Sequence, residues 1–206
     1  MADENKQQGP SPAQSAENSA AATPSVPPKP AAAAKSGAPV PLPWQSEMVD
    51  SFKGRFGSGI SEAVSYLGQN YLVVDRSALS EVLLAARAQE SFDYLVDLTA
   101  VHYPQRELPF DVVYVLYSFA RNERIRVKAQ IADGEAVQSV VQIWSTANWL
   151  ERECYDMFGI VFQGHPDLKR ILLPDGWQGH PLRKDYGIIQ QDQQWVKANL
   201  GIESGQ

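Results

Sequence analysis

Apolar and polar side chains alternate through the middle of the chain, and this alternation is the period of β-strands. It predicts strands over residues 92–101, 110–119 and 125–131. The second is apolar on both faces, which favours a central position, whereas the third should have one buried and one wetted face. Short links between the three predict an antiparallel meander. On one face of the first strand we expect Phe92, Tyr94, Val96, Leu98 and Ala100.

The residues before this meander predict two helices and a hairpin. Apolar positions recur at helical spacing over residues 45–56, and the Gly-Ser-Gly sequence that follows should end this helix. Residues 60–66 and 71–74 have the composition of two strands. Ser77 is then a suitable N-cap for a second amphipathic helix.

A third helix is predicted after the meander. Ser139 followed by Gln142 forms a capping-box pair, and the helix should run from there to about residue 158, with Ser145-Thr146 as a candidate break. We expect Arg152 and Asp156 to pair on its exposed side, because they are four residues apart. The opposite side is a narrow apolar arc formed by Ile143, Ala147, Leu150, Cys154, Met157 and Phe158.

Beyond residue 158 the periodicity ends, and two His-Pro pairs, a Leu-Pro pair and an Asp-Gly pair interrupt the chain. We therefore predict an α+β fold: a mixed, largely antiparallel sheet with helices packed on it, followed by a long irregular C-terminal arm. The predicted core domain spans residues 44–158, and the interaction arm with its tail spans 159–206. Residues 1–43 hold nine of the fourteen prolines and eleven alanines, so we expect a disordered tail.

The composition of the chain argues against several classes of function. The net charge of −6 argues against nucleic-acid binding, which requires a basic face. The single cysteine, Cys154, cannot form an internal disulfide, and an iron–sulfur cluster held by this chain alone needs about four thiolates. No apolar run approaches the about 18 residues of a membrane span. We expect a cytosolic protein in which Cys154 is a small core residue.

Charged and aromatic residues are concentrated between residues 151 and 187, in a segment that includes two Gly-His-Pro triplets. Such a mixture suits recognition by a fixed partner, because buried charges must be paired. Trp144, Trp149 and Trp177 are candidates for core or interface positions, and we expect Trp177 at an interface. The predicted partner interface comprises Glu151, Arg152, Glu153, Asp156, His165, Asp167, Arg170, Trp177, His180, Arg183, Lys184 and Asp185.

Three other chemistries are less well supported. Glu151 and Glu153 point in different directions on a helix, so they cannot act on one substrate as an acid–base pair. His165 and His180 with Cys154 or Asp167 lack the spacing of a metal site. A phosphate site at Arg170, Arg183 and Lys184 is less well supported, because no glycine-rich loop between a strand and a helix accompanies them. We also expect His102 at the rim of the sheet with a satisfied ring nitrogen.

The same segment resembles the C subunit (NuoC type) of the proton-pumping NADH–quinone oxidoreductase, respiratory complex I. The resemblance covers roughly residues 44–187, although His102 stands where the family often has an acid and the first forty-odd residues match nothing in the family core. Its motifs are Glu151-Arg152-Glu153, Asp156-Met157-Phe158-Gly159-Ile160, Gly164-His165-Pro166-Asp167-Leu168, Arg170-Ile171-Leu172 and Gly179-His180-Pro181-Leu182-Arg183-Lys184-Asp185-Tyr186.

The resemblance implies a non-catalytic structural subunit of an enzyme complex. It implies that this chain binds no cofactor, while FMN, iron–sulfur clusters and quinone sit on other subunits. The implied partners are the large quinone-site subunit and the cluster-bearing subunits. The implied location is the cytoplasmic face of the bacterial inner membrane, reached only through the complex. The alternative is the equivalent small subunit of a membrane-bound hydrogenase or of a ferredoxin- or F420-linked quinone oxidoreductase.

Overall fold

The computed structural model of the chain describes residues 39–187 and 193–201. Most of the predicted N-terminal tail lies outside these residues. Its last two positions form a short strand, β1 (Leu42–Pro43), that pairs with the next strand. The regular structure therefore begins just before the predicted core boundary at residue 44.

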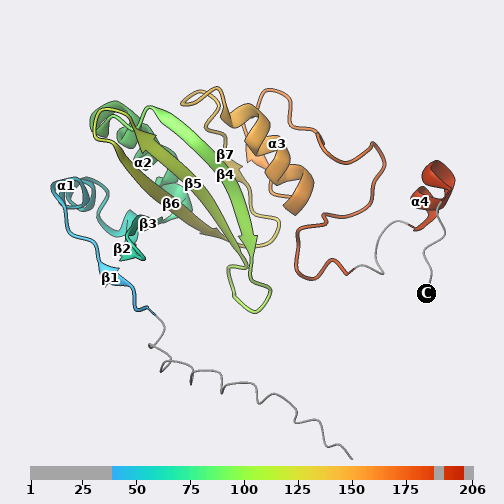
Figure 1. The fold of residues 1–206 in the computed structure, drawn as a ribbon, viewed down its shortest axis with the longest axis horizontal. Helices are drawn as coiled ribbons and strands as arrows, with labels where there is room; N and C mark the ends of the chain where they lie inside the picture. The colour runs from blue at the N-terminus through green and yellow to red at the C-terminus, as the bar shows by residue number, and fades with distance from the viewer. Residues whose placement is uncertain (1–38, 188–192, 202–206) are drawn as a thin grey trace, which may run out of the picture. The chain divides into compact units, whose positions relative to one another are not determined.

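Six strands form one mixed sheet in the order β1-β2-β3-β6-β5-β4 (Figure 1). Within this sheet only the β3–β6 pairing is parallel among the described strands, so the predicted mixed and largely antiparallel sheet is confirmed. The predicted meander is formed by β4, β5 and β6. The strands after β1 are β2 (Ile60–Tyr66), β3 (Gln69–Val74), β4 (Tyr94–His102), β5 (Phe110–Ser118) and β6 (Glu123–Ile131).

Helices cover one face of this sheet. In Figure 1, α2 lies behind the strands, α1 lies to their left, and α3 lies beside β4. A second, two-stranded parallel sheet joins β7 (Val137–Gln138) to β8 (Phe162–Gln163). The helices are α1 (Glu47–Phe56), the short 3-10 helix η1 (Gly57–Gly59), α2 (Arg76–Glu90), α3 (Ala147–Phe158) and α4 (Gln193–Leu200). None of the helices in the described ranges is long and apolar enough to cross a bilayer.

The core is one cluster of buried apolar side chains between the helices and the sheet. The alternating side chains of β6 enter it as predicted, and β5 is central, with Tyr114 fully buried. The prediction for β4 was wrong in part. A bulge between Leu95 and Asp97 shifts the alternation, so Leu95 is buried while Tyr94 is exposed. The extra residue of a bulge changes which face the preceding side chains occupy.

Two helix starts also differ from prediction. Asp75, rather than Ser77, occupies the N-cap position of α2, because its backbone is extended and Ser77 already lies inside the helix. The capping box at Ser139 is wrong as well. The Ser139 hydroxyl donates to Glu151 Oε2 at 2.7 Å, and the residues that follow form turns until α3 begins at Ala147.

Candidate functional site

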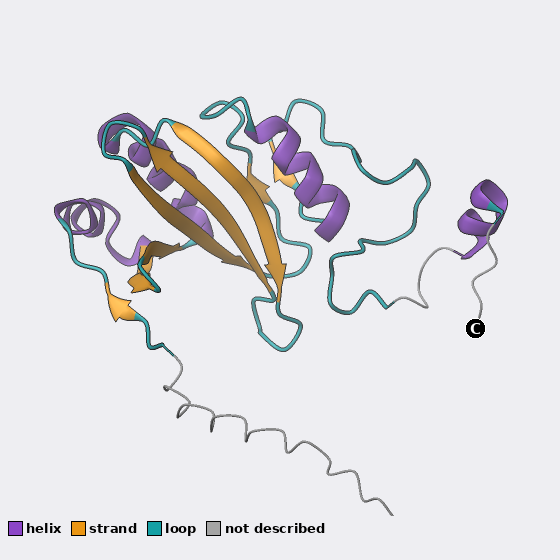
Figure 2. Cartoon of the chain, viewed as in Figure 1, coloured by secondary structure: helices purple, strands orange, loops and turns teal. Residues whose placement is uncertain are grey.

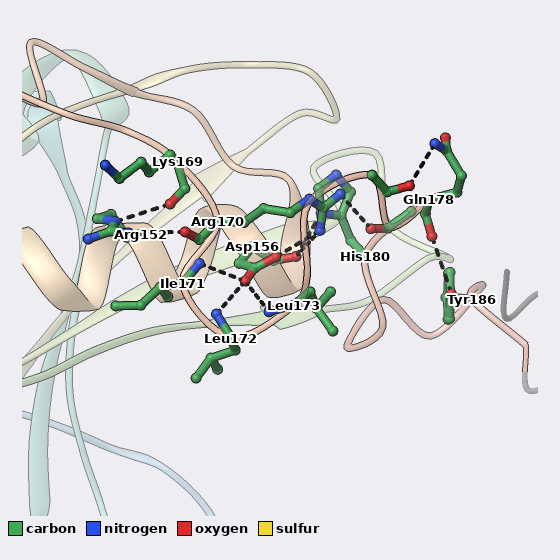
Figure 3. Close-up of polar contacts among 12 residues, drawn as sticks. Arg152, Asp156, Lys169, Arg170, Ile171, Leu172, Leu173, Gln178, His180 and Tyr186 are labelled. Carbon is green, nitrogen blue, oxygen red and sulfur yellow. Dashed lines mark hydrogen bonds and ion pairs between the residues drawn. The ribbon is translucent and has the colours of Figure 1, made fainter. Parts of the chain in front are cut away.

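The carboxylate of Asp156 is the centre of the candidate site. It lies in the last turn of α3 and has no exposed surface. Its Oδ1 accepts a hydrogen bond from the Arg170 guanidinium at 2.7 Å. Its Oδ2 accepts from three consecutive backbone N–H groups, those of Ile171, Leu172 and Leu173, at 2.8–2.9 Å (Figure 3). The expected exposed pair between this carboxylate and Arg152 is therefore wrong.

These hydrogen bonds determine the charge of Asp156. Burial alone raises the pKa of this carboxyl, because it disfavours the charged form. The N–H groups of Leu173, Ile171 and Leu172, together with Arg170, outweigh burial and hold the pKa below its ordinary value. Asp156 is thus a buried anion at neutral pH.

We define the C-terminal arm as residues 159–187, which Figure 2 shows almost entirely as loop. Arg152 binds the arm on the side of α3 next to Asp156. Its guanidinium donates to the carbonyl oxygens of Lys169 and Arg170 at 3.1 and 3.0 Å. The same guanidinium lies 5.3 Å from the ring centroid of Trp149, one turn earlier on the helix. Arg152 therefore links the helix, the arm and an exposed tryptophan.

The arm also satisfies the last carbonyl groups of α3, which lack partners within the helix. His180 Nδ1–H donates to the carbonyl oxygen of Asp156 at 2.9 Å, and the N–H of Leu182 donates to that of Met157 at 3.1 Å. Arg183 Nε donates to that of Phe158 at 2.6 Å. The end of α3 is capped by a segment more than twenty residues further along the chain.

Gly159 makes this close approach feasible. Its φ of +78° lies in the left-handed region, and a Cβ atom there would lie 2.7 Å from His180 Cδ2. Only glycine combines this backbone conformation with no side chain. The His180 ring can therefore occupy its observed position only because residue 159 has no side chain.

The far end of the arm is attached to the sheet. Arg183 makes a two-pronged ion pair with Asp133, at 2.8 and 3.1 Å, and this contact lowers the pKa of the Asp133 carboxyl. The Lys184 N–H donates to His102 Nδ1 at 2.9 Å, which confirms the predicted rim histidine with a satisfied nitrogen. Asp133 was not predicted, because nothing in its sequence context distinguishes it from an ordinary turn residue.

Glu151 also serves the interior of the chain. Its fully buried carboxylate accepts from the Ser139 hydroxyl and from the Val140 N–H, both at 2.7 Å. Burial raises its pKa, although both hydrogen bonds oppose this shift. Glu153 is exposed, so the two acids do point apart. Cys154 is a buried core residue, as predicted, and burial raises its pKa well above the ordinary value.

The two histidines of the Gly-His-Pro triplets are engaged separately. His165 Nε2–H donates to the Asn148 carbonyl at 3.0 Å, and its Nδ1 accepts from the Asp167 N–H. Asp167 forms an exposed ion pair with Lys169. Within the described ranges, no three His, Cys, Asp or Glu side chains are grouped as a metal site requires.

The remaining predicted interface residues lie at the outer edge of the arm. Lys184 and Asp185 are exposed, and Asp185 lies 3.6 Å from the His102 ring. Trp177 is half-buried, with its ring 5.5 Å from that of Trp195, and its indole N–H is buried without a hydrogen-bond partner among the described residues. The charges therefore divide into those that fasten the arm and those that remain at its surface.

The surface that results is apolar at several points beside the fastened charges. Trp149 and Leu172 are each 62% exposed, and Leu182 is 49% exposed. The sequence offers Trp149 only as one of three candidate tryptophans, and Leu172 was not predicted as a site residue. The fold and the site thus define a small α+β protein whose C-terminal arm folds back onto its last core helix.

Known proteins are similar to this chain in sequence. The family described as "Respiratory-chain NADH dehydrogenase, 30 Kd subunit" matches residues 72–192. The C subunit of the NADH-quinone oxidoreductase of Geotalea uraniireducens is 39% identical over 153 residues, covering 74% of this chain and 93% of the relative. The corresponding C subunit of Brucella abortus is 47% identical over 144 residues, covering 69% and 71%. The chain therefore belongs to the 30 Kd subunit family of the respiratory-chain NADH dehydrogenase.

Two solved structures are similar to this one. A trypsin-resistant fragment (1–134) of Nqo5 is 31% identical, with a TM-score of 0.52, and the match covers 59% of this chain and 98% of the fragment. A chain of the membrane-bound sulfane sulfur reductase, an archaeal respiratory membrane complex, is 22% identical with a TM-score of 0.62, covering 76% and 91%. The second likeness shows a shared fold.

Proposed function

We propose that this chain is a non-catalytic structural subunit of the peripheral arm of proton-translocating NADH–quinone oxidoreductase. It supports electron transfer from NADH to quinone by holding neighbouring subunits in place. FMN, iron–sulfur clusters and quinone are bound by those neighbours rather than by this chain. The complex places the chain at the cytoplasmic face of the inner membrane.

The contact surface is the outer side of α3 together with the C-terminal arm. It faces the large quinone-site subunit and the cluster-bearing subunits. The observation that carries this proposal is the exposure of Trp149 and Leu172 beside Arg152, whose guanidinium is already held by two carbonyl groups. Tryptophan and arginine dominate binding hot spots, and a rigid surface loses little entropy on binding.

The twelve predicted interface residues take three roles in this proposal. Glu151 and Asp156 are fully buried, so they shape the surface from within. Arg170, His180 and Arg183 fasten the arm. The direct contacts come from Arg152, Glu153, His165, Asp167, Trp177, Lys184 and Asp185, together with Trp149 and Leu172.

The test is assembly of the complex with Leu172→Asp, compared with the control Leu84→Asp. Leu84 is also a largely exposed leucine, but it lies on α2. We expect Leu172→Asp to reduce incorporation on native gels at least about tenfold, because a charge there is desolvated on binding. Leu84→Asp should assemble normally. Normal assembly of Leu172→Asp with lost turnover would show that the arm takes part in chemistry instead.

The electron donor distinguishes the alternative assignment. The small subunit of a related hydrogenase or of a ferredoxin- or F420-linked complex would use the same scaffold, and the fold shared with the sulfane sulfur reductase chain is consistent with that. The purified complex should oxidise NADH. Activity with reduced ferredoxin or reduced F420, but not with NADH, would favour the alternative.

A further inference from the structure

The sheet has a second face that no described helix covers. The apolar side chains of β6 that enter the core are at odd-numbered positions, so Arg124, Arg126 and Lys128 lie on the opposite face. In Figure 1 no described helix passes in front of β5 and β6. Val113 of β5 is buried on this face although it lies outside the core cluster. We call this surface the open face.

The three cations form a row along a central strand. In the sheet register, Arg126 lies between Tyr71 and Val115, and Lys128 lies between Val73 and Val113. Both cations are half-buried, because their aliphatic stems lie along apolar neighbours. The Lys128 amine lies 4.1 Å from the centre of the Tyr71 ring. The row of positive charges on β6 is thus flanked by valine and tyrosine side chains of β3 and β5.

None of the three cations forms an ion pair with a residue in the described part of the chain. Neither Arg124 nor Arg126 makes an ion pair or a hydrogen bond with a described residue. The carboxylate of Asp111 is paired with Arg106 at 2.9 Å. Glu62 and Asp97 are each separated from β6 by an intervening strand.

The row ends in a pocket of about 310 Å³ at the start of β6. Arg124 and Arg126 line it together with Tyr117, Asn122, Glu123 and residues 68–70. The Glu123 carboxylate accepts from the Asn70 amide at 3.5 Å. The Tyr117 hydroxyl donates to Asn122 Oδ1 at 2.5 Å, so the hydroxyl oxygen remains able to accept a hydrogen bond. A carboxylate in this pocket would meet the guanidinium groups of Arg124 and Arg126, whose two positive charges outnumber the single negative charge of Glu123.

We infer that the open face binds an acidic, extended segment of a neighbouring polypeptide in the assembled complex. Alternate residues of an extended chain are about 6.8 Å apart, which is also the spacing of the cations along β6. Carboxylates at alternate positions of the segment would pair with Arg124, Arg126 and Lys128, and the aliphatic parts of these acidic side chains would lie over Val113 and Val115. The inference rests on the proposed function, because it places the segment on a partner subunit.

Charge selects this occupant over other anions. The chain carries a net charge of −6, which repels the long polyanion of a nucleic acid and an anionic membrane surface. A short acidic segment avoids this repulsion, because it contacts only the positive row. The buried or half-buried valine and tyrosine side chains between the cations suit a polypeptide better than a phosphate backbone.

The test is photo-cross-linking in membranes that carry the assembled complex. p-Benzoylphenylalanine at Tyr117 reports on the open face, and the same group at Leu172 reports on the arm surface. We expect a Tyr117 adduct with an acid-rich peptide of another subunit. A lipid adduct, a nucleic-acid adduct or no adduct at Tyr117, with a protein adduct at Leu172, overturns this inference alone. Failure at Leu172 counts against the proposed function.

Charge variants give a second readout. Arg124→Gln, Arg126→Gln and Lys128→Gln together should lower the Tyr117 cross-link yield about tenfold, because three partly buried ion pairs are lost. The control combines Lys53→Gln, Arg55→Gln and Arg87→Gln, which removes the same charge from exposed positions on α1 and α2. An unchanged yield in the first variant, or an equal loss in the control, overturns the role of the row.

Discussion

A buried carboxylate is stable only when hydrogen bonds replace the water that it loses. Asp156 meets this requirement with three backbone N–H groups and one guanidinium, all from the C-terminal arm. The same contacts satisfy the N–H groups of residues that are not part of a helix or strand. The carboxylate therefore fixes the path of an irregular segment that lacks the regular backbone hydrogen bonds of a helix or sheet.

Asp156→Asn should detach this part of the arm. An amide has the same shape, but its NH₂ group faces donors, so at least one N–H or the guanidinium is left without an acceptor. The expected cost is about 2–4 kcal/mol. Hydrogen exchange at Ile171, Leu172 and Leu173 should accelerate, and the melting temperature should fall. Asp167→Asn is the matched control, because its exposed carboxylate pairs with the Lys169 side chain rather than with the arm's backbone, so that exchange should stay unchanged.

The attachment of His180 should weaken in mild acid. Burial, followed by the positive charges of Arg170 and Arg183, lowers the pKa of this ring, although its hydrogen bond to Asp156 opposes the shift. The folded pKa is therefore below the unfolded value of about 6.5, and the unfolded state binds more protons between the two. The stabilisation is complete above pH about 6.5 and is lost as the pH falls through the folded pKa. Asp156 stays ionised in this window, because its own pKa is lowered.

His180→Asn tests this pH dependence. Asparagine keeps an N–H donor near the Nδ1 position but does not titrate. The protection factor of the Leu182 amide, which is its exchange rate relative to the intrinsic rate at the same pH, should fall between pH 7 and pH 5 in the unaltered chain and much less in His180→Asn. His165→Asn should behave as the unaltered chain does. A pH dependence that survives in His180→Asn would assign it to another group.

At the scale of elements, the sequence predicted the strands better than the starts of the helices. β5 and β6 are close to their predicted ranges, because burial alternates regularly there. β4 was misphased, since nothing in its sequence distinguishes a bulge at Val96 from continuous alternation. The capping box at Ser139 failed because its hydroxyl binds Glu151, a partner twelve residues away.

The C-terminal arm shows the same limit. Its irregularity and its charges were predictable from proline, glycine and composition, but their partners were not. Asp156, Arg170 and Arg183 were expected to meet another subunit, and the structure gives each a partner within the chain. Pairings between residues many positions apart depend on the tertiary path, which local patterns do not encode.

The junction between α3 and the arm should be sensitive to a single methyl group. Gly159→Ala combines a positive φ with a Cβ atom 2.7 Å from His180, so we expect a loss of about 2–4 kcal/mol. Gly164→Ala is the control, because its φ of +81° is similar but its Cβ would meet nothing within 4 Å. The control should lose only about 1 kcal/mol. Urea unfolding measures both, and equal losses would mean that strain in φ alone explains the effect.

At the scale of the whole molecule, two groups of charged residues lie on opposite faces of the sheet. The helix side of the sheet carries the anchored arm, and the other face carries the row of cations on β6. The two surfaces lie on opposite sides of the sheet, so they can bind different partners at once. A subunit that joins neighbours requires such a division, because one surface alone would hold a single partner.

Residues 1–38 should be dispensable for folding and assembly, whereas residues 39–44 should not be. Deletion of residues 1–38 should leave both the melting temperature and incorporation into the complex unchanged, because a segment so rich in proline and alanine has little apolar surface to bury. Deletion of residues 1–44 also removes β1 and Trp44, which is only 9% exposed and whose N–H donates to the Ala63 carbonyl at 2.9 Å. That longer deletion should cost about 3–5 kcal/mol, as expected when a buried tryptophan is lost. Thermal unfolding and native-gel assembly of the two truncated chains provide the comparison. A lowered melting temperature after removal of residues 1–38 alone would show that this segment packs against the domain.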